Sequence, residues 1–203
     1  MARFSRQPVV LAAHPSLGVN SIAELVALAK TKPGLPYATA AAQQHIAAEW
    51  FANLAGIKLT AVPYKGGGQA TTDLVGGQVL LASLGSSPLM PYYRSGKIRL
   101  LAQTTPARAP SLPAVPTYEE AGVKGLVIEQ WLGAFLPAGA SREIVTRFNA
   151  QIVKALSEPS VRERFALAAL EPFSSTPEQF AALVREDYEK YGRLVRELNV
   201  KFN

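Results

Sequence analysis

The sequence predicts an α/β protein: a lobe with a mostly parallel sheet, followed by a helix-rich second part. Short apolar runs alternate with amphipathic helical patterns from residue 9 to residue 103, and such alternation requires crossover connections between parallel strands. After residue 105 the helical period dominates. We therefore expect residues 9–103 to form a complete α/β lobe and the rest of the chain to form a helix-rich part with little sheet.

The elements of the first part follow from local signals. The apolar run Val9–Ala13 indicates a buried strand. Ser21 and Glu24 have capping-box spacing ahead of a helix that Pro33 ends. By the same reasoning, further strands are expected at 35–39, 59–62, 79–82 and 98–103, and further helices at 44–55, with Ile46, Trp50, Phe51 and Leu54 inward, at 69–75 and at 87–94.

The second part is predicted to be rich in helix and poor in sheet. A proline-rich connection leads to a short helix capped by Thr117 and stopped by Gly122, and then to a strand at 132–136. Helices follow from Ser141, Pro159 and Thr176. Their inward residues are expected to be Ile144, Val145, Phe148 and Ile152, and later Phe180, Leu183, Val184, Tyr191, Leu194, Val195 and Leu198. Such apolar faces need a partner layer, so we expect an incomplete lobe that promotes self-association.

Composition excludes several classes of function. The chain has no cysteine, so disulfides, thiolate metal sites and cysteine catalysis are ruled out. The net charge of +6 comes from scattered lysines and arginines, without the basic stripe typical of nucleic-acid binding. We expect no nucleic-acid partner, although a positive field favours anionic ligands.

Two loops are candidates for an anion site. Each links a predicted strand to a predicted helix through small residues, which lets an anion approach the free N–H groups of the helix N-terminus. In a parallel sheet, ligands bind at the carboxyl ends of strands. The alternative is that both are ordinary turns whose glycines serve backbone geometry. The candidate residues are Thr39, Ala40, Ala41, Ala42, Gln43, Gln44 and His45, and Tyr64, Lys65, Gly66, Gly67 and Gly68.

Catalysis finds little support in the sequence. Its two histidines, His14 and His45, lie too far apart in sequence to form a metal site on their own. Ser86 and Ser87 have no obvious base, and no Gly-x-Ser-x-Gly elbow is present. The glycines match neither a P-loop nor a dinucleotide fingerprint. We expect a protein without catalytic residues, cofactor or metal.

Several segments, in this order, resemble the receptors of tripartite tricarboxylate transporters. They are Leu11-Ala12-Ala13-His14-Pro15-Ser16-Leu17, Ser21-Ile22-Ala23-Glu24-Leu25, Tyr37-Ala38-Thr39, Val62-Pro63-Tyr64-Lys65-Gly66-Gly67, Leu74-Val75-Gly76-Gly77-Gln78-Val79, Gly96-Lys97-Ile98-Arg99, Leu112-Pro113-Ala114-Val115-Pro116-Thr117, Trp131-Leu132-Gly133 and Pro137-Ala138-Gly139.

The resemblance implies a two-lobed receptor of type II periplasmic-binding-protein fold, with Val9–Ala13 and Arg99–Thr104 as crossing strands. It divides the chain into a remnant of the first lobe or lead-in over 1–8, a complete ligand-binding lobe over 9–104, and the helix-rich C-terminal part of the first lobe over 105–203. It implies a periplasmic location, a small carboxylate ligand and the membrane components of a transporter as partners. Ser83, Gly85 and Trp131 join the candidate ligand-binding residues.

The chain departs from the family pattern in three places. The family's N-terminal segment is not found, which implies a truncated receptor that binds carboxylates poorly. Ala40–Ala42 replaces a serine- and glycine-rich loop, and Leu80 and Leu84 stand where aspartates are frequent, so a ligand less polar than citrate is expected. Two other classes stay open: a cytoplasmic ligand-sensing regulator of similar fold, for which no helix-turn-helix is seen, and a doubly wound hydrolase, which lacks a nucleophile–base pair.

Overall fold

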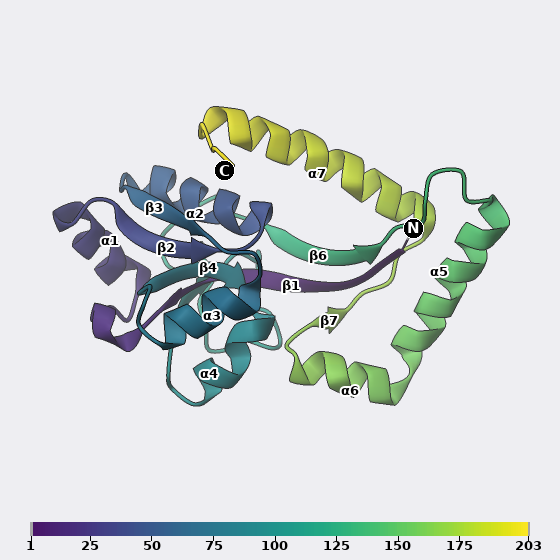
Figure 1. Ribbon diagram of the computed structural model, residues 1–203, viewed down its shortest axis with the longest axis horizontal. Coiled ribbons are helices and arrows are strands. Elements are labelled where there is room, and N and C mark those ends of the chain that lie inside the picture. Colours follow the sequence, from purple (N-terminus) through teal and green to yellow (C-terminus); the bar gives the residue numbers. More distant parts are fainter. Residues whose placement is uncertain (1, 203) are drawn as a thin grey trace.

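The computed structural model describes residues 2–202 (Figure 1). The strands are β1 (Ala2–Ala13), β2 (Leu35–Thr39), β3 (Leu59–Pro63), β4 (Leu81–Gly85), β5 (Arg99–Gln103), β6 (Glu129–Ala134) and β7 (Glu171–Pro172). The α-helices are α1 (Ile22–Thr31), α2 (Ala42–Ala55), α3 (Gly67–Val75), α4 (Met90–Arg94), α5 (Arg142–Ser157), α6 (Pro159–Leu167) and α7 (Pro177–Glu197), and the 3-10 turns are η1 (Pro15–Leu17) and η2 (Ser87–Leu89).

The main sheet has the strand order β3-β2-β4-β1-β5. Strand β2 is parallel to β3 and β4, as expected from the helical crossovers. Strand β1 is antiparallel to β4 and β5, so the sheet is mixed. The sequence did not reveal this direction because β1 enters the sheet from the other part of the molecule and not through a crossover helix.

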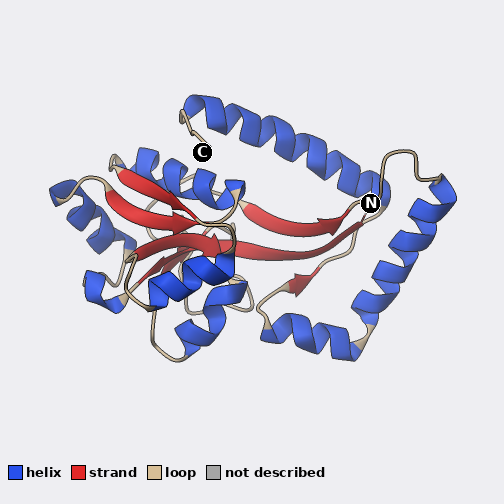
Figure 2. Ribbon diagram, viewed as in Figure 1, coloured by secondary structure: helices blue, strands red, loops and turns tan. Residues whose placement is uncertain are grey.

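Helices cover both faces of this sheet (Figure 2). Alternation along β1 shows how the two layers are separated. Leu11 packs in one core cluster with residues of α1 and α2, whereas Val10 packs in a second cluster with residues of α3, because successive strand side chains point to opposite faces. Leu54, expected inward on α2, is instead 46% exposed.

Strand β1 joins the two parts of the molecule. Its first half, from Ala2 to Pro8, pairs antiparallel with β6 and β7, and its second half, from Val9, pairs with β4 and β5. Residues 2–8, expected as a remnant of the first lobe or a lead-in, therefore belong to one continuous strand that runs across the molecule (Figure 1). Two other strands differ from the expectation at their first residue: β4 begins two residues later, and β6 begins three residues earlier.

The connection after β5 is organised by the buried amide of Gln103. Its Nε2 donates to the carbonyls of Leu112 (3.1 Å) and Val115 (2.7 Å), while its Oε1 accepts from Ala109 N (2.9 Å). The Leu-Pro-x-Val-Pro-Thr segment is thus folded around one side chain. Leu112 and Val115 are buried in the core cluster that contains residues of α3, so this connection packs on the α/β part of the molecule although it follows residue 104. The division of the chain into two parts at residue 104 stays a prediction.

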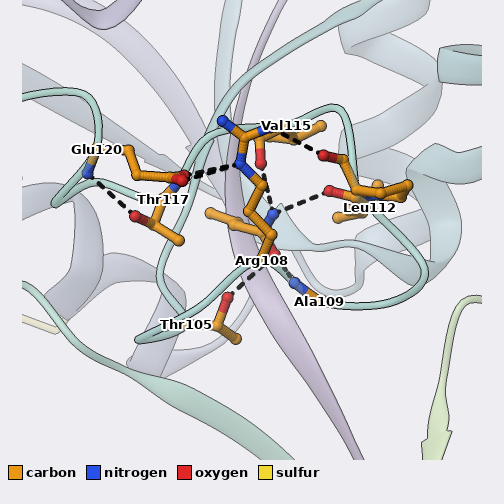
Figure 3. Close-up of polar contacts among 9 residues, drawn as sticks. Thr105, Arg108, Ala109, Leu112, Val115, Thr117 and Glu120 are labelled. Atoms are coloured by element: carbon orange, nitrogen blue, oxygen red, sulfur yellow. Dashed lines mark hydrogen bonds and ion pairs between the residues drawn. The ribbon is translucent and has the colours of Figure 1, made fainter.

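The short helix expected at Thr117 is a single turn. Thr117 and Glu120 exchange the reciprocal bonds of a capping box, and Glu120 also pairs with Arg108 (Figure 3). Gly122 takes a left-handed conformation (φ 88°) directly afterwards. One turn cannot offset the cost of helix nucleation, so this segment forms a turn and not the expected helix.

The C-terminal part consists of β6, β7 and the helices α5, α6 and α7. Ser141 caps α5, Pro159 is the first residue of α6, and Thr176 with Gln179 forms a complete capping box on α7, all as predicted. Ile144, expected inward on α5, is instead 55% exposed. No helix in the region 2–202 has the length and apolar character needed to cross a membrane.

Self-association through this part stays a prediction. Phe135 after β6 and Ile144 on α5 are more than half exposed, and burying them against a second copy removes apolar surface from water. We expect sedimentation velocity to show concentration-dependent association that the double variant Phe135→Ser, Ile144→Ser reduces. The matched control is Leu54→Ser, which changes an exposed leucine on the other part of the molecule, and an equal reduction by this control would contradict the prediction.

Candidate functional site

The two candidate loops lie side by side. They follow β2 and β3, which are parallel and in register, with Thr39 opposite Pro63. The Tyr64 amide donates to the Thr39 carbonyl at 2.8 Å. Between them is a pocket of about 210 Å³, lined by Thr39, Ala40, Ala41, Ala42, His45, Ala61, Pro63, Tyr64, Lys201 and Phe202.

Helices α2 and α3 begin directly after these loops without side-chain caps. Their N-cap residues are Ala41 and Gly66, neither of which makes a capping bond. In contrast, α1, α5 and α7 are capped by Ser21, Ser141 and Thr176. The first amides of a helix have no partner within it, so α2 and α3 present free N–H groups and the positive ends of their dipoles.

Two buried hydroxyl groups near these loops have no hydrogen-bond partner among the described residues. They belong to Thr39, at the end of β2, and Ser86, directly after β4, which are 3% and 0% exposed. A buried polar group without a partner is costly. Thr39 lines the pocket, so its hydroxyl is available to a polar ligand or a water molecule there.

His45 contributes a neutral ring to the pocket. Burial lowers the pKa of His45, and the nearby Glu49 carboxylate, 3.7 Å from Nε2, opposes this effect only in part. Glu49 Oε1 also accepts the hydroxyl of Tyr37 at 2.7 Å. Tyr64 donates its hydroxyl to Asp73 at 2.8 Å. Lys201 also lines the pocket and brings a positive charge to it.

The lowered pKa of His45 predicts a pH dependence of stability. The unfolded chain binds a proton at His45 near the usual value of about 6.5, whereas the folded chain binds it only at lower pH. The free energy of unfolding should therefore fall as pH decreases below about 6.5 towards the folded-state pKa. Urea unfolding between pH 7.5 and 5 should show this fall in the native chain and less of it in His45→Asn. His14→Asn is the control, and an unchanged slope in His45→Asn would contradict the prediction.

The structure distributes the candidate residues over four places, and Gln43 and Trp131 line the last of these, a separate groove. Thr39, Ala40, Ala41, Ala42, His45 and Tyr64 line the pocket. Lys65, Gly66, Gly67 and Gly68 lie at the start of α3 beside it. Gln44, Ser83 and Gly85 are buried behind the α2 loop, where Ser83 Oγ donates to the Gln44 carbonyl at 2.7 Å.

Trp131 lies apart from the pocket, on β6 under α7. Its Nε1 donates to Asp187 at 2.6 Å, and its ring packs edge-on against Phe180. It lines a larger open groove of about 870 Å³ together with Ala42 and Gln43. Sequence reasoning missed Lys201 and Phe202, because no local pattern connects the last residues with a loop near residue 40.

Comparison with known proteins shows to which family the chain belongs. The sequence model of the family described as "Tripartite tricarboxylate transporter family receptor" matches residues 1–200. The chain belongs to this family. Protein BugT of Bordetella pertussis is 33% identical over 198 residues, which cover 96% of the chain and 60% of BugT. The chain thus spans about three fifths of this relative's length.

Solved structures of the family share the fold. The R. palustris protein Rpa4515 with adipate superimposes with a TM-score of 0.92 at 31% identity, over 97% of the chain and 67% of Rpa4515. The periplasmic binding protein BugD gives 0.91 at 27% identity, covering 98% and 69%. MatC from Rhodopseudomonas palustris with bound malate gives 0.85 at 28%, covering 96% and 68%. The predicted periplasmic-binding-protein fold is confirmed.

Proposed function

We propose that the chain captures a small carboxylate as part of an extracytoplasmic receptor for a tripartite transporter. The observation that carries this proposal is the convergence of two uncapped helix N-termini, those of α2 and α3, beside one pocket. Uncapped N-termini bind anions through free amides and the helix dipole. The membrane components of such a transporter are the proposed partners, and the periplasm is the proposed location.

The lining of the pocket supports a ligand with an apolar middle. Ala40, Ala41 and Ala42 line the pocket with small apolar side chains, and the ring of His45 is neutral at pH 7. Lys201 adds a cation at one side. This chemistry favours a carboxylate on a short hydrocarbon chain over a ligand rich in hydroxyl groups, and two similar structures hold adipate and malate.

The pocket offers no catalytic arrangement. Thr39, Tyr64 and Lys201 bring hydroxyl and amine groups to the lining, but among the described residues none of them is hydrogen-bonded to His45. The His45 ring contacts Glu49 on the same helix and the rings of Tyr37 and Phe202. We therefore propose a receptor that releases its ligand unchanged.

Calorimetric titration tests the proposal. The panel contains mono- and dicarboxylates of increasing chain length, citrate, and the matching amides as uncharged controls. The chain of 203 residues is compared with a longer form in which the first lobe of the family is restored. Closing receptors use contacts from both lobes, and each lost bond to a charged group costs about 1.5–3 kcal/mol.

We expect the longer form to bind a dicarboxylate at least about 100-fold more tightly than the chain of 203 residues, which corresponds to two such bonds. Amides should not bind. Equal and tight binding by both forms would show that residues 1–203 hold the whole site. Failure of both forms to bind any carboxylate would contradict the proposed function.

A further inference from the structure

Three buried glutamine side chains meet behind the candidate site. Gln7 lies on β1, Gln44 on α2 and Gln130 on β6, and each is at most 8% exposed. Gln130 Oε1 accepts from Nε2 of Gln7 and from Nε2 of Gln44, at 3.4 Å in both cases. Gln7 and Gln130 are also cross-strand partners in the pairing of β1 with β6.

The side-chain oxygens of Gln7 and Gln44 accept hydrogen bonds from backbone N–H groups of two loops. Gln7 Oε1 accepts from Ser87 N at 3.0 Å, directly after β4. Gln44 Oε1 accepts from Ala40 N at 3.1 Å, in the loop after β2. A continuous path of hydrogen bonds therefore runs from Ser87 through the three glutamines to Ala40.

Gly85 marks how closely β4 approaches this network. A Cβ atom at this position would lie 2.7 Å from both Gln130 Oε1 and Gln7 Nε2. Real Cβ atoms do not make such short contacts, so any side chain at Gly85 would displace the amides. The place of Gly85 among the candidate residues thus has a physical reason different from direct ligand contact.

We propose that Gln130 is a positioning residue that couples the loop after β2 to the loop after β4. Its single oxygen is shared by the two amides that hold these loops. Without that oxygen, the Nε2 groups of Gln7 and Gln44 lose an acceptor in a buried setting, which costs more than the bond itself contributes. A ligand that orders one loop then also orders the other, and this last step rests on the proposed function.

The two hydrogen bonds that Gln130 Oε1 accepts are long, as expected where the side chains can shift relative to one another. Both are 3.4 Å, longer than the usual 2.9–3.0 Å of an N–H···O bond. The bonds to the loop amides are shorter, at 3.0 and 3.1 Å. A small movement of β6 relative to β1 and α2 would therefore change the centre of the network first and transmit the change to both loops.

Amide hydrogen exchange measured by NMR on the ligand-free chain tests this coupling. In Gln130→Met, which keeps the length of the side chain and removes the acceptor, we expect exchange at both Ala40 and Ser87 to accelerate about fivefold or more, as for the loss of about one hydrogen bond. The Glu24 amide, capped by Ser21 Oγ in α1, should not change. Gln130→Glu, which retains an acceptor oxygen, should restore slow exchange.

Two further variants keep the test decisive if Gln130→Met does not fold. Gln44→Met should accelerate exchange at Ser87, which Gln44 does not touch, and Gln43→Met at the neighbouring position is its matched control. Acceleration at Ala40 alone, or at neither amide, would overturn the proposal. No ligand is used, so a failure here is distinct from a failure of carboxylate binding.

Discussion

Replacement of Phe180 by alanine should lower the free energy of unfolding by about 3–5 kcal/mol, the range for truncating a fully buried aromatic side chain. Phe180 is 0% exposed and attaches α7 to β6. Its ring centroid lies 5.0 Å from that of Trp131 and 5.2 Å from that of Phe135. The ring also lies over Gly133, where an added Cβ would clash with it.

Urea denaturation followed by circular dichroism measures this loss. The matched control is Tyr188→Ala on the same helix, because Tyr188 is 82% exposed and such surface substitutions usually change stability by less than about 0.5 kcal/mol. If the two variants had the same midpoint, α7 would not be docked on β6 through Phe180.

Replacement of Ala41 by aspartate should weaken carboxylate binding by about 100-fold or more while it stabilises the fold. Ala41 is the N-cap of α2, in an extended conformation, and makes no capping bond. An aspartate there would cap the free amides, worth about 0.5–2 kcal/mol. It would also place a negative charge in the pocket, and two like charges about 4 Å apart repel by about 4 kcal/mol at an effective dielectric constant near 20.

Calorimetry and urea denaturation together check this opposition between stability and binding. Both measurements use whichever form binds carboxylate, the chain of 203 residues or the longer form. Ala41→Asn is the matched control, since it caps the same amides without a charge and should weaken binding less. Ser21→Asp changes the cap of α1, a helix that does not line the pocket, and should leave affinity unchanged. Native affinity in Ala41→Asp would show that the carboxylate binds elsewhere.

Local signals predicted many elements correctly. Strand β2 has the predicted bounds, Leu35–Thr39. The helix starts at Ser141, Pro159 and Thr176 are where the capping and proline rules placed them. At Ser21 the cap forms, but Glu24 accepts from the amide of Asn20 and not from Ser21. These features depend on interactions within a few residues, which is why the sequence alone predicts them.

The candidate loops were predicted in the same way, from strands followed by small residues and helix starts. Their proximity also followed, because adjacent parallel strands end at one edge of a sheet. The burial of Gln44, Ser83 and Gly85 and the distance of Trp131 from the pocket did not follow. Burial of a given side chain depends on what packs over it, and this cover comes from elements far along the chain.

Tertiary packing alone decided the features that join the two parts of the molecule. The direction of β1, its pairing with β6 and the approach of Lys201 to the Thr39 loop have no local signal. Gln7 and Gln130 bond to one another across 123 positions of sequence. Residues 2–8 could not be recognised as half of a long strand, because a strand is stabilised by bonds to its neighbours in the sheet, and the neighbours of β1 lie in four other segments of the chain.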